Sequence, residues 1–459
     1  MQHLPNRNTR LTGLAAALVL MASGGANAQS DAAVALERQT DDAFRQVLQQ
    51  PQNLGQWSAY AQLLIKAGNY EGGIAALERL LLEPNASPDL RVDIAVLYYR
   101  LGSYAMAESM LTTALADSRL QGDNRALAEA LLADARKRGQ RSQLRGVVTL
   151  GLKHQTNPTY RTDASQVLSA GVLGPLAADQ RPDDDNDISV GLRLNHRYDL
   201  ERQNSATIVT NFGAYVVDYR SAHGSRLVAG ENKPYDLQLL DLNTGLEFKP
   251  APATAGGLTL RPHIILSNVV AKNHQYLRNA GLGLDLTWQA DERTLYEFTV
   301  DGVKRDFSER VDVANANLQD GRLYSLRGRV SRELAPGQVL IGEYAMRKGT
   351  SERDMYDFES HEIRATYSIS YQSPVAKGSY WTTAIWLGAL NRTFDGPDAA
   401  VSATEAHKDR EWRVGINQTL PLAPLWSLIL SAEHARNRAN LPNYRYRNTS
   451  VSATVLRSF

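Results

Sequence analysis

The sequence predicts two parts, a short α-helical module of the tetratricopeptide type followed by a 14-stranded antiparallel transmembrane β-barrel. Three observations lead to this prediction. The first residues have the pattern of an export signal, and apolar residues recur at helical spacing from about residue 31 to 140. From about residue 144, apolar and polar residues alternate to the end of the chain, which is typical of strands with one apolar face.

The composition excludes several classes of protein. The chain has 459 residues, with 43% apolar residues and 50 Lys+Arg against 49 Asp+Glu, so a disordered chain and a polybasic nucleic-acid binder are both poor fits. The absence of cysteine removes disulfides, thiolate metal sites, cysteine nucleophiles and a lipid-modified N-terminal cysteine. A formal charge of +1 supplies no long-range field that would steer a partner.

The first 28 residues form the predicted export signal. Arg7 and Arg10 supply a positive start, Leu11 to Met21 is an apolar stretch, and Ala26-Asn27-Ala28 has the small residues of a cleavage site. We therefore expect an exported protein whose mature form begins at residue 29. No later run approaches the roughly 18 to 20 uninterrupted apolar residues of a membrane-spanning helix.

Residues 29–142 form the predicted helical domain. A self-comparison at an offset of 34 residues, the tetratricopeptide length, aligns Ala61 with Ala95, Gly68 with Gly102, Tyr70 with Tyr104, Gly73 with Ala107 and Leu77 with Leu111. Small residues let paired helices approach, the glycines end the first helix of each pair, and Trp57 stands where the repeat expects tryptophan. An unrelated helical bundle is the alternative.

Two repeats need further helices as caps, because about three are normally required to bury a continuous core. We expect these caps at Asp31–Gln50 and Asn124–Arg138, which end at Pro51 and Gly139. The first helix of each pair would line a groove with Ser58, Gln62, Lys66, Asp89, Tyr99 and Arg100. The alternative is that these side chains are simply solvated.

Residues 143–459 form the predicted barrel. Fourteen alternating segments are centred near residues 149, 192, 212, 242, 264, 283, 299, 326, 343, 365, 386, 414, 431 and 453. The connectors 289–292, 335–337 and 420–424 are short, whereas 154–186, 306–319, 350–358 and 394–407 are long. An even strand number with short turns at one end and long loops at the other is typical of outer-membrane barrels. A large soluble β-sandwich is the alternative.

The last strand carries a further cue. Val451, Ala453, Val455 and the terminal Phe459 share one parity, and this pattern resembles the recognition signal of barrel assembly in the outer membrane.

Charged residues of the opposite parity are predicted to line the barrel lumen. They are Arg193, Glu247, Asp285, Glu297, Asp301, Arg327, Arg329, Glu362, Arg364, Glu411 and Arg413. Both signs occur, so the lumen is bipolar rather than selective for one charge. Opposite charges on neighbouring strands can form cross-strand pairs, each contributing roughly 0.2–1 kcal/mol. Such an ion-pair network could stiffen and plug the lumen instead of forming a conduction path.

Motifs for chemistry are missing from the sequence. It has no glycine-rich phosphate loop, Gly-x-Ser-x-Gly elbow or His-Glu-x-x-His motif, and its nine histidines are scattered. The acidic run Asp183 to Asp187 could bind calcium but is too short to surround an ion, and a solvated acidic loop fits it better. We expect no catalytic residue, no metal site, no cofactor and no enzyme activity.

Two local sequences carry a resemblance to a known family. Residues 97–107 (LYYRLGSYAMA) look like its last helical repeat, and residues 151–158 (GLKHQTNP) look like the glycine-then-Asn-Pro opening of its first strand. With the export signal and the order of the two domains, they resemble the surface lipoprotein assembly modulator (Slam) family, whose barrels help move client proteins to the bacterial surface.

The resemblance implies a translocator in the outer membrane with its helical domain in the periplasm. The helical domain would recruit a client, either a surface lipoprotein or a secreted soluble protein. The short segment Gly139–Gln143 would tether the helical domain at the barrel mouth. Further expected partners are periplasmic chaperones, outer-membrane lipids and the barrel assembly machinery, with no nucleic acid and a monomeric state. An exopolysaccharide export porin and a solute porin are the alternatives.

Overall fold

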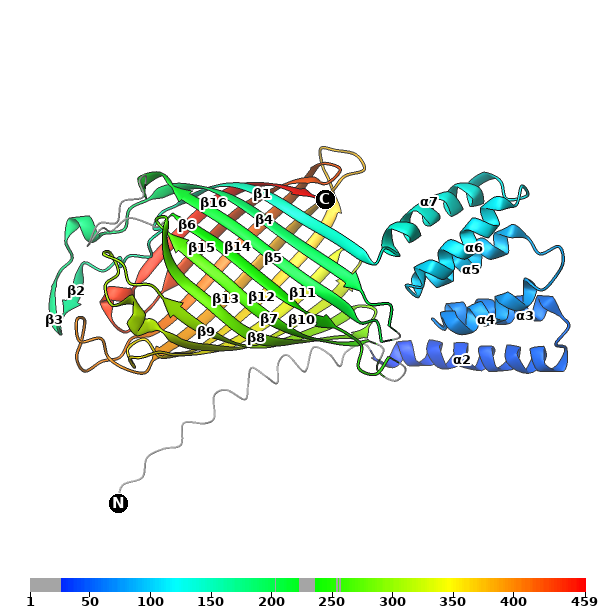
Figure 1. Ribbon diagram of the computed structural model, residues 1–459, viewed down its shortest axis with the longest axis horizontal. Helices are drawn as coiled ribbons and strands as arrows, with labels where there is room; N and C mark the ends of the chain where they lie inside the picture. The colour runs from blue at the N-terminus through cyan, green and yellow to red at the C-terminus, as the bar shows by residue number, and fades with distance from the viewer. Residues whose placement is uncertain (1–25, 203, 223–235, 253–254, 256) are drawn as a thin grey trace, which may run out of the picture. The chain divides into compact units, whose positions relative to one another are not determined.

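The computed structural model describes residues 26–202, 204–222, 236–252, 255 and 257–459. Most of the predicted export signal, residues 1–25, lies outside the described residues. The chain divides into two compact units, one ending at Gln140 and one starting at Arg141 (Figure 1). The order of the elements, helices first and then strands, confirms the predicted fold class.

The helical unit consists of consecutive helices joined by short turns. Their bounds are α2 Ala26–Gln49, α3 Leu54–Lys66, α4 Tyr70–Leu80, α5 Pro88–Arg100, α6 Tyr104–Ala116 and α7 Gly122–Arg138. The helices α3, α5 and α7 begin at residues 54, 88 and 122, so the 34-residue period extends to a third helix. The predicted capping helices correspond to α2 and α7.

Local sequence explains where these helices begin and end. The side chain of Asn53 accepts hydrogen bonds from the first turn of α3, and Asn69 does the same for α4. Gly68 and Gly102 follow the first helix of each repeat with φ of 79° and 76°, a conformation that glycine adopts without strain. Gly73 lies against Ile65, where an added Cβ would come within 2.7 Å of the isoleucine side chain.

Two apolar clusters hold the helices together. The first is centred on Ala61, Ile74 and Ile94, and the second on Ala95 and Leu111. Ile94, Ala95 and Leu111 are completely buried. Because α5 contributes to both clusters, the stack has a continuous core from α3 to α7.

Fourteen antiparallel strands close into a barrel (Figure 1). Their bounds are β1 Ser142–Gln155, β4 Asp185–Asp199, β5 Thr207–Tyr219, β6 Leu237–Glu247, β7 Leu258–Ala271, β8 His274–Asp291, β9 Thr294–Phe307, β10 Gly321–Ala335, β11 Gln338–Thr350, β12 Phe358–Gln372, β13 Tyr380–Phe394, β14 Lys408–Ala423, β15 Trp426–Asn437 and β16 Tyr446–Ser458. Each of the predicted strand centres falls inside one of them. Pairing of β1 with both β4 and β16 completes the closure.

The connections differ at the two ends of the barrel. At one end, the turn end, they are 200–206, 248–257, 292–293, 336–337, 373–379 and 424–425. At the other, the loop end, they are 156–184, 220–236, 272–273, 308–320, 351–357, 395–407 and 438–445. The predicted long connectors all lie at the loop end. One loop-end connection is nevertheless a tight turn, at Lys272 and Asn273, which both have positive φ.

The first long loop contains a hairpin that the sequence analysis did not predict. Strands β2 Gln166–Ser169 and β3 Val172–Pro175 pair only with each other. The side chain of Asn443 holds the hairpin through hydrogen bonds of 2.9 Å to both the backbone N–H and the carbonyl of Leu168. The predicted linker also needs correction, because Ser142 and Gln143 already belong to β1.

The outer surface of the barrel is apolar. Leu152, Leu282 and Leu387 belong to the outward parity and are 61%, 67% and 58% exposed. Leaving such a surface in water is unfavourable by about 25 cal/mol per Å², whereas a closed barrel with an apolar belt suits hydrocarbon. Among the described residues, no helix is long and apolar enough to cross a membrane.

The predicted assembly-signal residues lie on the closing strand. Val451, Ala453 and Val455 face outward, directly opposite His154, Leu152 and Leu150 of β1. The backbone of Phe459 exchanges two hydrogen bonds, of 2.9 and 3.0 Å, with Gly146. Its ring occupies the space that a side chain at position 146 would need. Recognition of these residues during assembly stays a prediction.

Candidate functional site: the charged wall of the lumen

All the charged residues predicted for the lumen have the parity opposite to the apolar outward residues. The structure places each of them on the inner wall: Arg193 on β4, Glu247 on β6, Asp285 on β8, Glu297 and Asp301 on β9, Arg327 and Arg329 on β10, Glu362 and Arg364 on β12, and Glu411 and Arg413 on β14. The pattern of alternation was therefore sufficient to assign their side of the sheet. It was not sufficient to assign their partners.

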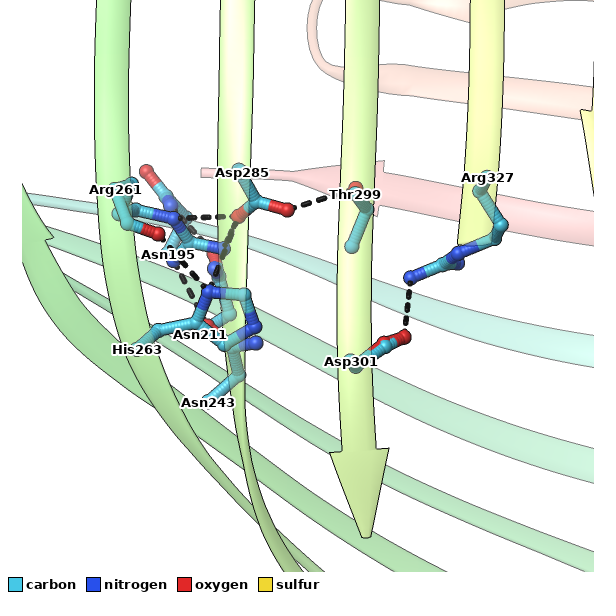
Figure 2. Close-up of polar contacts among 9 residues, drawn as sticks. All are labelled: Asn195, Asn211, Asn243, Arg261, His263, Asp285, Thr299, Asp301 and Arg327. Atoms are coloured by element: carbon cyan, nitrogen blue, oxygen red, sulfur yellow. Dashed lines mark hydrogen bonds and ion pairs between the residues drawn. The ribbon is translucent and has the colours of Figure 1, made fainter. Parts of the chain in front are cut away.

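Asp285 lies at the centre of a polar cluster that spans β6 to β9. Its Oδ2 accepts hydrogen bonds of 2.6 and 2.9 Å from the guanidinium of Arg261, and its Oδ1 accepts one of 2.8 Å from Thr299 (Figure 2). Arg261 also donates to Asn243 at 2.8 Å. Both carboxylate oxygens are thus engaged, and the pair is well shielded, with side-chain exposures of 14% for Arg261 and 23% for Asp285.

His263 lies beside this cluster. Its Nδ1 is 3.4 Å from Asp285 Oδ2 (Figure 2). Its imidazole covers Gly283 on the neighbouring strand. A side chain at position 283 would collide with the ring, so this glycine lets the imidazole lie flat against the wall. The sequence analysis missed both Arg261 and His263. Their parity, opposite to the apolar Ile264 and Leu266, is the signal that could have identified them.

Cross-strand ion pairs continue around the wall from β9 to β12. Arg327 contacts Asp301 at 3.4 Å, and Arg329 contacts Glu297 at 2.8 Å (the first pair is shown in Figure 2). These are the pairs expected from the sequence for neighbouring strands. Both side chains of the Arg329–Glu297 pair, and the arginine of the Arg327–Asp301 pair, are more exposed than Arg261 and Asp285, so we expect each pair to contribute less.

The charged residues of β12 and β14 differ in their partners. Glu362 pairs with Arg347 of β11 at 2.9 Å, and not with Arg364 two residues away. Arg364 instead lies over the indole of Trp386, 3.8 Å from its centroid. Glu411 contacts Arg413 and the hydroxyl of Tyr446, and it is almost completely buried. Only the three-dimensional register decides which of several arginines meets a given carboxylate.

Arg193 and the amide residues near it form a less charged sector of the wall. Asn195 and Asn211 are joined by a hydrogen bond of 2.7 Å (Figure 2), and Arg197 pairs with Glu247 at 2.5 Å. Arg193 lines a cavity of about 460 Å³ near the turn end together with Arg145 and Asp241. The lumen wall thus carries both charges and amides, arranged mostly in satisfied pairs.

The acidic run 183–187 leads into β4, and its carboxylates within that strand are bound by protein groups. Asp185 accepts hydrogen bonds from the N–H and the hydroxyl of Ser221, and Asp187 accepts one of 2.9 Å from Gln155. In the described part of the chain, no three His, Asp or Glu side chains converge in a way that could hold a metal ion.

The residues predicted for the helical groove divide into two sets. Ser58, Gln62 and Lys66 lie on α3, where Gln62 and Lys66 are exposed. On α5, Asp89 accepts hydrogen bonds of 2.7 Å from Ser87 and from Asn124 of α7, and these bonds lower the pKa of its carboxyl. Contacts with a neighbouring helix therefore occupy part of the predicted groove.

The other two residues of α5 also contact neighbouring helices. The Tyr99 hydroxyl donates a hydrogen bond to Asp134 of α7, which raises the pKa of the tyrosine. The guanidinium of Arg100 lies over the ring of Tyr70, 5.6 Å from its centroid. The sequence analysis assigned α7 only a capping role and so missed Asn124 and Asp134, although the 34-residue period predicts them as neighbours of α5.

Comparisons with known proteins identify no family. No family model matches the chain, and no curated protein matches it. Among solved structures, it is similar to the outer membrane protein opdK from Pseudomonas aeruginosa, with 12% identity, a TM-score of 0.32, and coverage of 69% of this chain and 99% of that chain.

Two further solved structures show a similar degree of likeness. The outer membrane channel DcaP of Acinetobacter baumannii has 10% identity and a TM-score of 0.38, over 69% of this chain and 97% of that one. A bacterial polysaccharide outer membrane secretin has 10% identity and a TM-score of 0.36, over 68% and 98%. Likenesses this weak carry no argument about the function of this chain.

Proposed function

We propose that this protein is an outer-membrane translocator that helps client proteins cross the membrane, with the helical unit recruiting the client. The observation that carries the proposal is the combination, in one chain, of a 34-residue helical repeat stack and a closed barrel with a wall of both charges and amides. The local sequences that resemble the Slam family support the same function. Surface lipoproteins and secreted soluble proteins are the client classes that we propose.

The lumen wall suits a polypeptide better than a polymer of one charge. A polypeptide carries amides and side chains of both signs, and the wall presents amides such as Asn195 and pairs such as Arg329 with Glu297. Because the wall charges are mostly paired, a passing segment would meet hydrogen-bonding groups without a large net attraction to either sign. A wall biased to one sign would instead favour a charged polysaccharide.

Basic residues at the loop end support an orientation for the barrel. Arg436 has outward parity and lies opposite Arg447 of β16, and Arg410 is on the adjacent strand. Asp163 neutralises Arg447 at 2.6 Å, whereas neither Arg436 nor Arg410 has an ion pair among the described residues. We propose that phosphate groups of the outer leaflet pair with Arg436 and Arg410, which would put the loop end outside and the helical unit in the periplasm.

The covalent link gives recruitment a physical benefit. The segment between α7 and β1 is only Gly139–Arg141. A client held by the helical unit would stay near the barrel at an effective concentration of about millimolar for so short a linker. The sequence has no phosphate-binding loop, so we propose that client folding or capture outside the cell provides the direction of transport.

Surface proteomics tests this function. The surfaces and media of a strain with the gene and a strain lacking it are labelled and compared by mass spectrometry. The proposal predicts that one or two specific proteins leave the surface and accumulate in the periplasm, and that the full chain restores them. An unchanged protein profile with altered surface polysaccharide would overturn the proposal in favour of an export porin.

A variant of the helical unit tests the recruitment step. Exchanging Gln62 and Lys66, both exposed on α3, for alanine and glutamate should lower client export while the barrel remains in the membrane. The matched control is Ala75→Glu, because Ala75 is exposed on α4. Glu78 and Arg79 of the same helix are not used, because Glu78 accepts a hydrogen bond from Tyr98 and the Arg79 guanidinium lies over Trp57. Equal export by both variants and the wild type would show that this part of α3 does not recruit the client.

A further inference from the structure

A second cavity lies inside the barrel near the loop end. It has a volume of about 380 Å³, within the size range of small-molecule sites. We call it the mouth pocket and define it by Asn279, Arg305, Tyr356, Phe358, Arg392 and Phe394. Arg305, Phe358, Arg392 and Phe394 all lie within three residues of the loop end of their strands.

The mouth pocket contains two guanidinium groups and no carboxylate among its lining residues. Elsewhere on the wall, inward arginines such as Arg261, Arg329 and Arg413 form ion pairs with carboxylates, although Arg364 does not and lies over Trp386. Within the described residues, neither Arg305 nor Arg392 has an ion pair. The pocket is therefore a place where two positive charges lie together without a carboxylate.

Both arginines are held against aromatic rings. The guanidinium of Arg305 lies 4.7 Å from the centroid of Phe307, and that of Arg392 lies 5.3 Å from the centroid of Phe358. The Nε of Arg392 is buried and has no hydrogen-bond partner in the part of the chain that the structure describes. A buried donor without a partner is costly, so the site is incomplete as it stands.

Carboxylates near the pocket are engaged elsewhere. Asp409 lies opposite Arg392 in the strand register, but its Oδ1 contacts His407 Nε2 at 2.7 Å and Asn437 Nδ2 at 2.6 Å. Asp306 belongs to the outward parity and pairs with Lys304 at 2.7 Å, and Asp320 accepts the backbone N–H of Phe307. Asp409 is near enough for its charge to act on Arg392, but none of these acids forms an ion pair with either arginine in the described residues.

The remaining walls define the rest of a ligand. Phe358 and Phe394 offer apolar surface, with their ring centroids 5.8 Å apart, and Leu277 and Leu323 extend it. We propose that the mouth pocket binds a carboxylate carried on an apolar or aromatic group, with the carboxylate between Arg305 and Arg392. The fork of a guanidinium matches a carboxylate in geometry and charge. Such a group could belong to a small acid or to the end of a peptide chain.

Calorimetry on the full-length protein in detergent tests the proposal. The probes are phenylacetate and its neutral analogue phenylacetamide, which differ only in the anionic group. We expect phenylacetate to bind at least tenfold more tightly. A second pair, N-acetyl-glycyl-phenylalanine and its C-terminal amide, distinguishes the two sources. Stronger binding of the peptide acid than of phenylacetate indicates a chain terminus, and the reverse order indicates a small acid.

Variants locate the binding in the mouth pocket. Arg305→Gln and Arg392→Gln should each weaken phenylacetate binding about tenfold or more, because each removes a charge-assisted hydrogen bond. Arg392→Lys keeps the charge without the fork and should weaken it less. Arg278→Gln is the matched control, since Arg278 is adjacent to the pocket residue Asn279 but has outward parity and is exposed.

Folding is checked for every variant by the shift in gel mobility between unheated and heated samples. Equal binding of phenylacetate and phenylacetamide, or unchanged binding by folded Arg305→Gln and Arg392→Gln variants, would overturn the proposal. These results do not depend on which client the barrel carries.

Discussion

The helical unit and the barrel place their apolar residues in opposite ways. In the helical unit, Ile94 and Leu111 are completely buried, whereas in the barrel Leu282 and Leu387 are exposed and the charged residues face inward. The helical unit therefore derives its stability from burying apolar side chains away from water. The barrel depends on lipid for its outer surface and on backbone and side-chain pairs for its inner one. Substitutions of the same kind should consequently have different effects in the two units.

The largest effect is expected for a cavity in the helical core. Leu111→Ala should destabilise the helical unit by about 2–5 kcal/mol, because the leucine is completely buried. Hydrogen exchange of the α5 and α6 amides in the full chain measures the loss. The barrel, assayed by gel mobility of unheated samples, should be unaffected, and a parallel loss of barrel stability would break the distinction between the two units.

A charge on the outer surface should disturb the barrel almost as strongly. Leu326→Arg, near the middle of β10, should cost about 2–4 kcal/mol, whereas Ser325→Arg on the inward parity should cost much less. Unfolding of both variants in urea from lipid vesicles provides the comparison. Equal stability of the two would contradict the assignment of inward and outward faces.

Removing the best-shielded lumen pair should have an intermediate effect. Asp285→Ala leaves the guanidinium of Arg261 without its carboxylate, and we expect a loss of about 1–3 kcal/mol. Asp285→Asn retains an acceptor and should recover part of that loss. If the alanine variant unfolds at the wild-type urea concentration, then the cluster around Asp285 does not brace the wall.

The more exposed lumen pair should contribute less. Glu297→Ala removes the nearer acid of Arg329 and leaves Glu343 at 3.9 Å. Because Glu297 and Arg329 are 35% and 42% exposed, the expected cost is about 1 kcal/mol or less. The same urea titration compares it with Asp285→Ala. A larger loss at Glu297 would mean that solvent exposure is not what distinguishes the two pairs.

The smallest effect concerns the pH dependence of the helical unit. Hydrogen bonds and the charge of Arg119 lower the pKa of Asp117 to about 2. Its ionised form is therefore favoured by folding, and the associated stability is present above about pH 4 and is lost as the pH falls towards 2. Asp117→Asn should be slightly less stable than wild type at pH 7, with the difference vanishing near pH 2. A constant difference across this range would rule out the ionic contribution.

Sequence reasoning was most successful where a residue's role depends on periodicity. The alternation of Leu282, Leu284 and Leu286 with Gly283 and Asp285 is enough to give both the strand and its outward side. The 34-residue repeat likewise gives the helix starts. The hairpin β2–β3 escaped because strands of four residues are too short to show a period.

Partnerships between distant residues were beyond the sequence. Arg347, Arg364 and Arg413 all have inward parity near Glu362 or Glu411, and the strand register alone determines which arginine pairs with which acid. The unpaired arginines of the mouth pocket were missed for the same reason. A count of charges shows a balanced lumen, but it cannot show where the balance fails locally.

Passage of a client protein through the lumen is the central claim, and site-specific photo-cross-linking in cells tests it most directly. A photoreactive amino acid is placed at Thr366, which faces inward on β12, and in a second strain at its outward-facing neighbour Ala365. We predict protein adducts at position 366 that contain an exported protein and are missing at position 365. Exported-protein adducts at neither position, or equally at both, would contradict transport through the lumen.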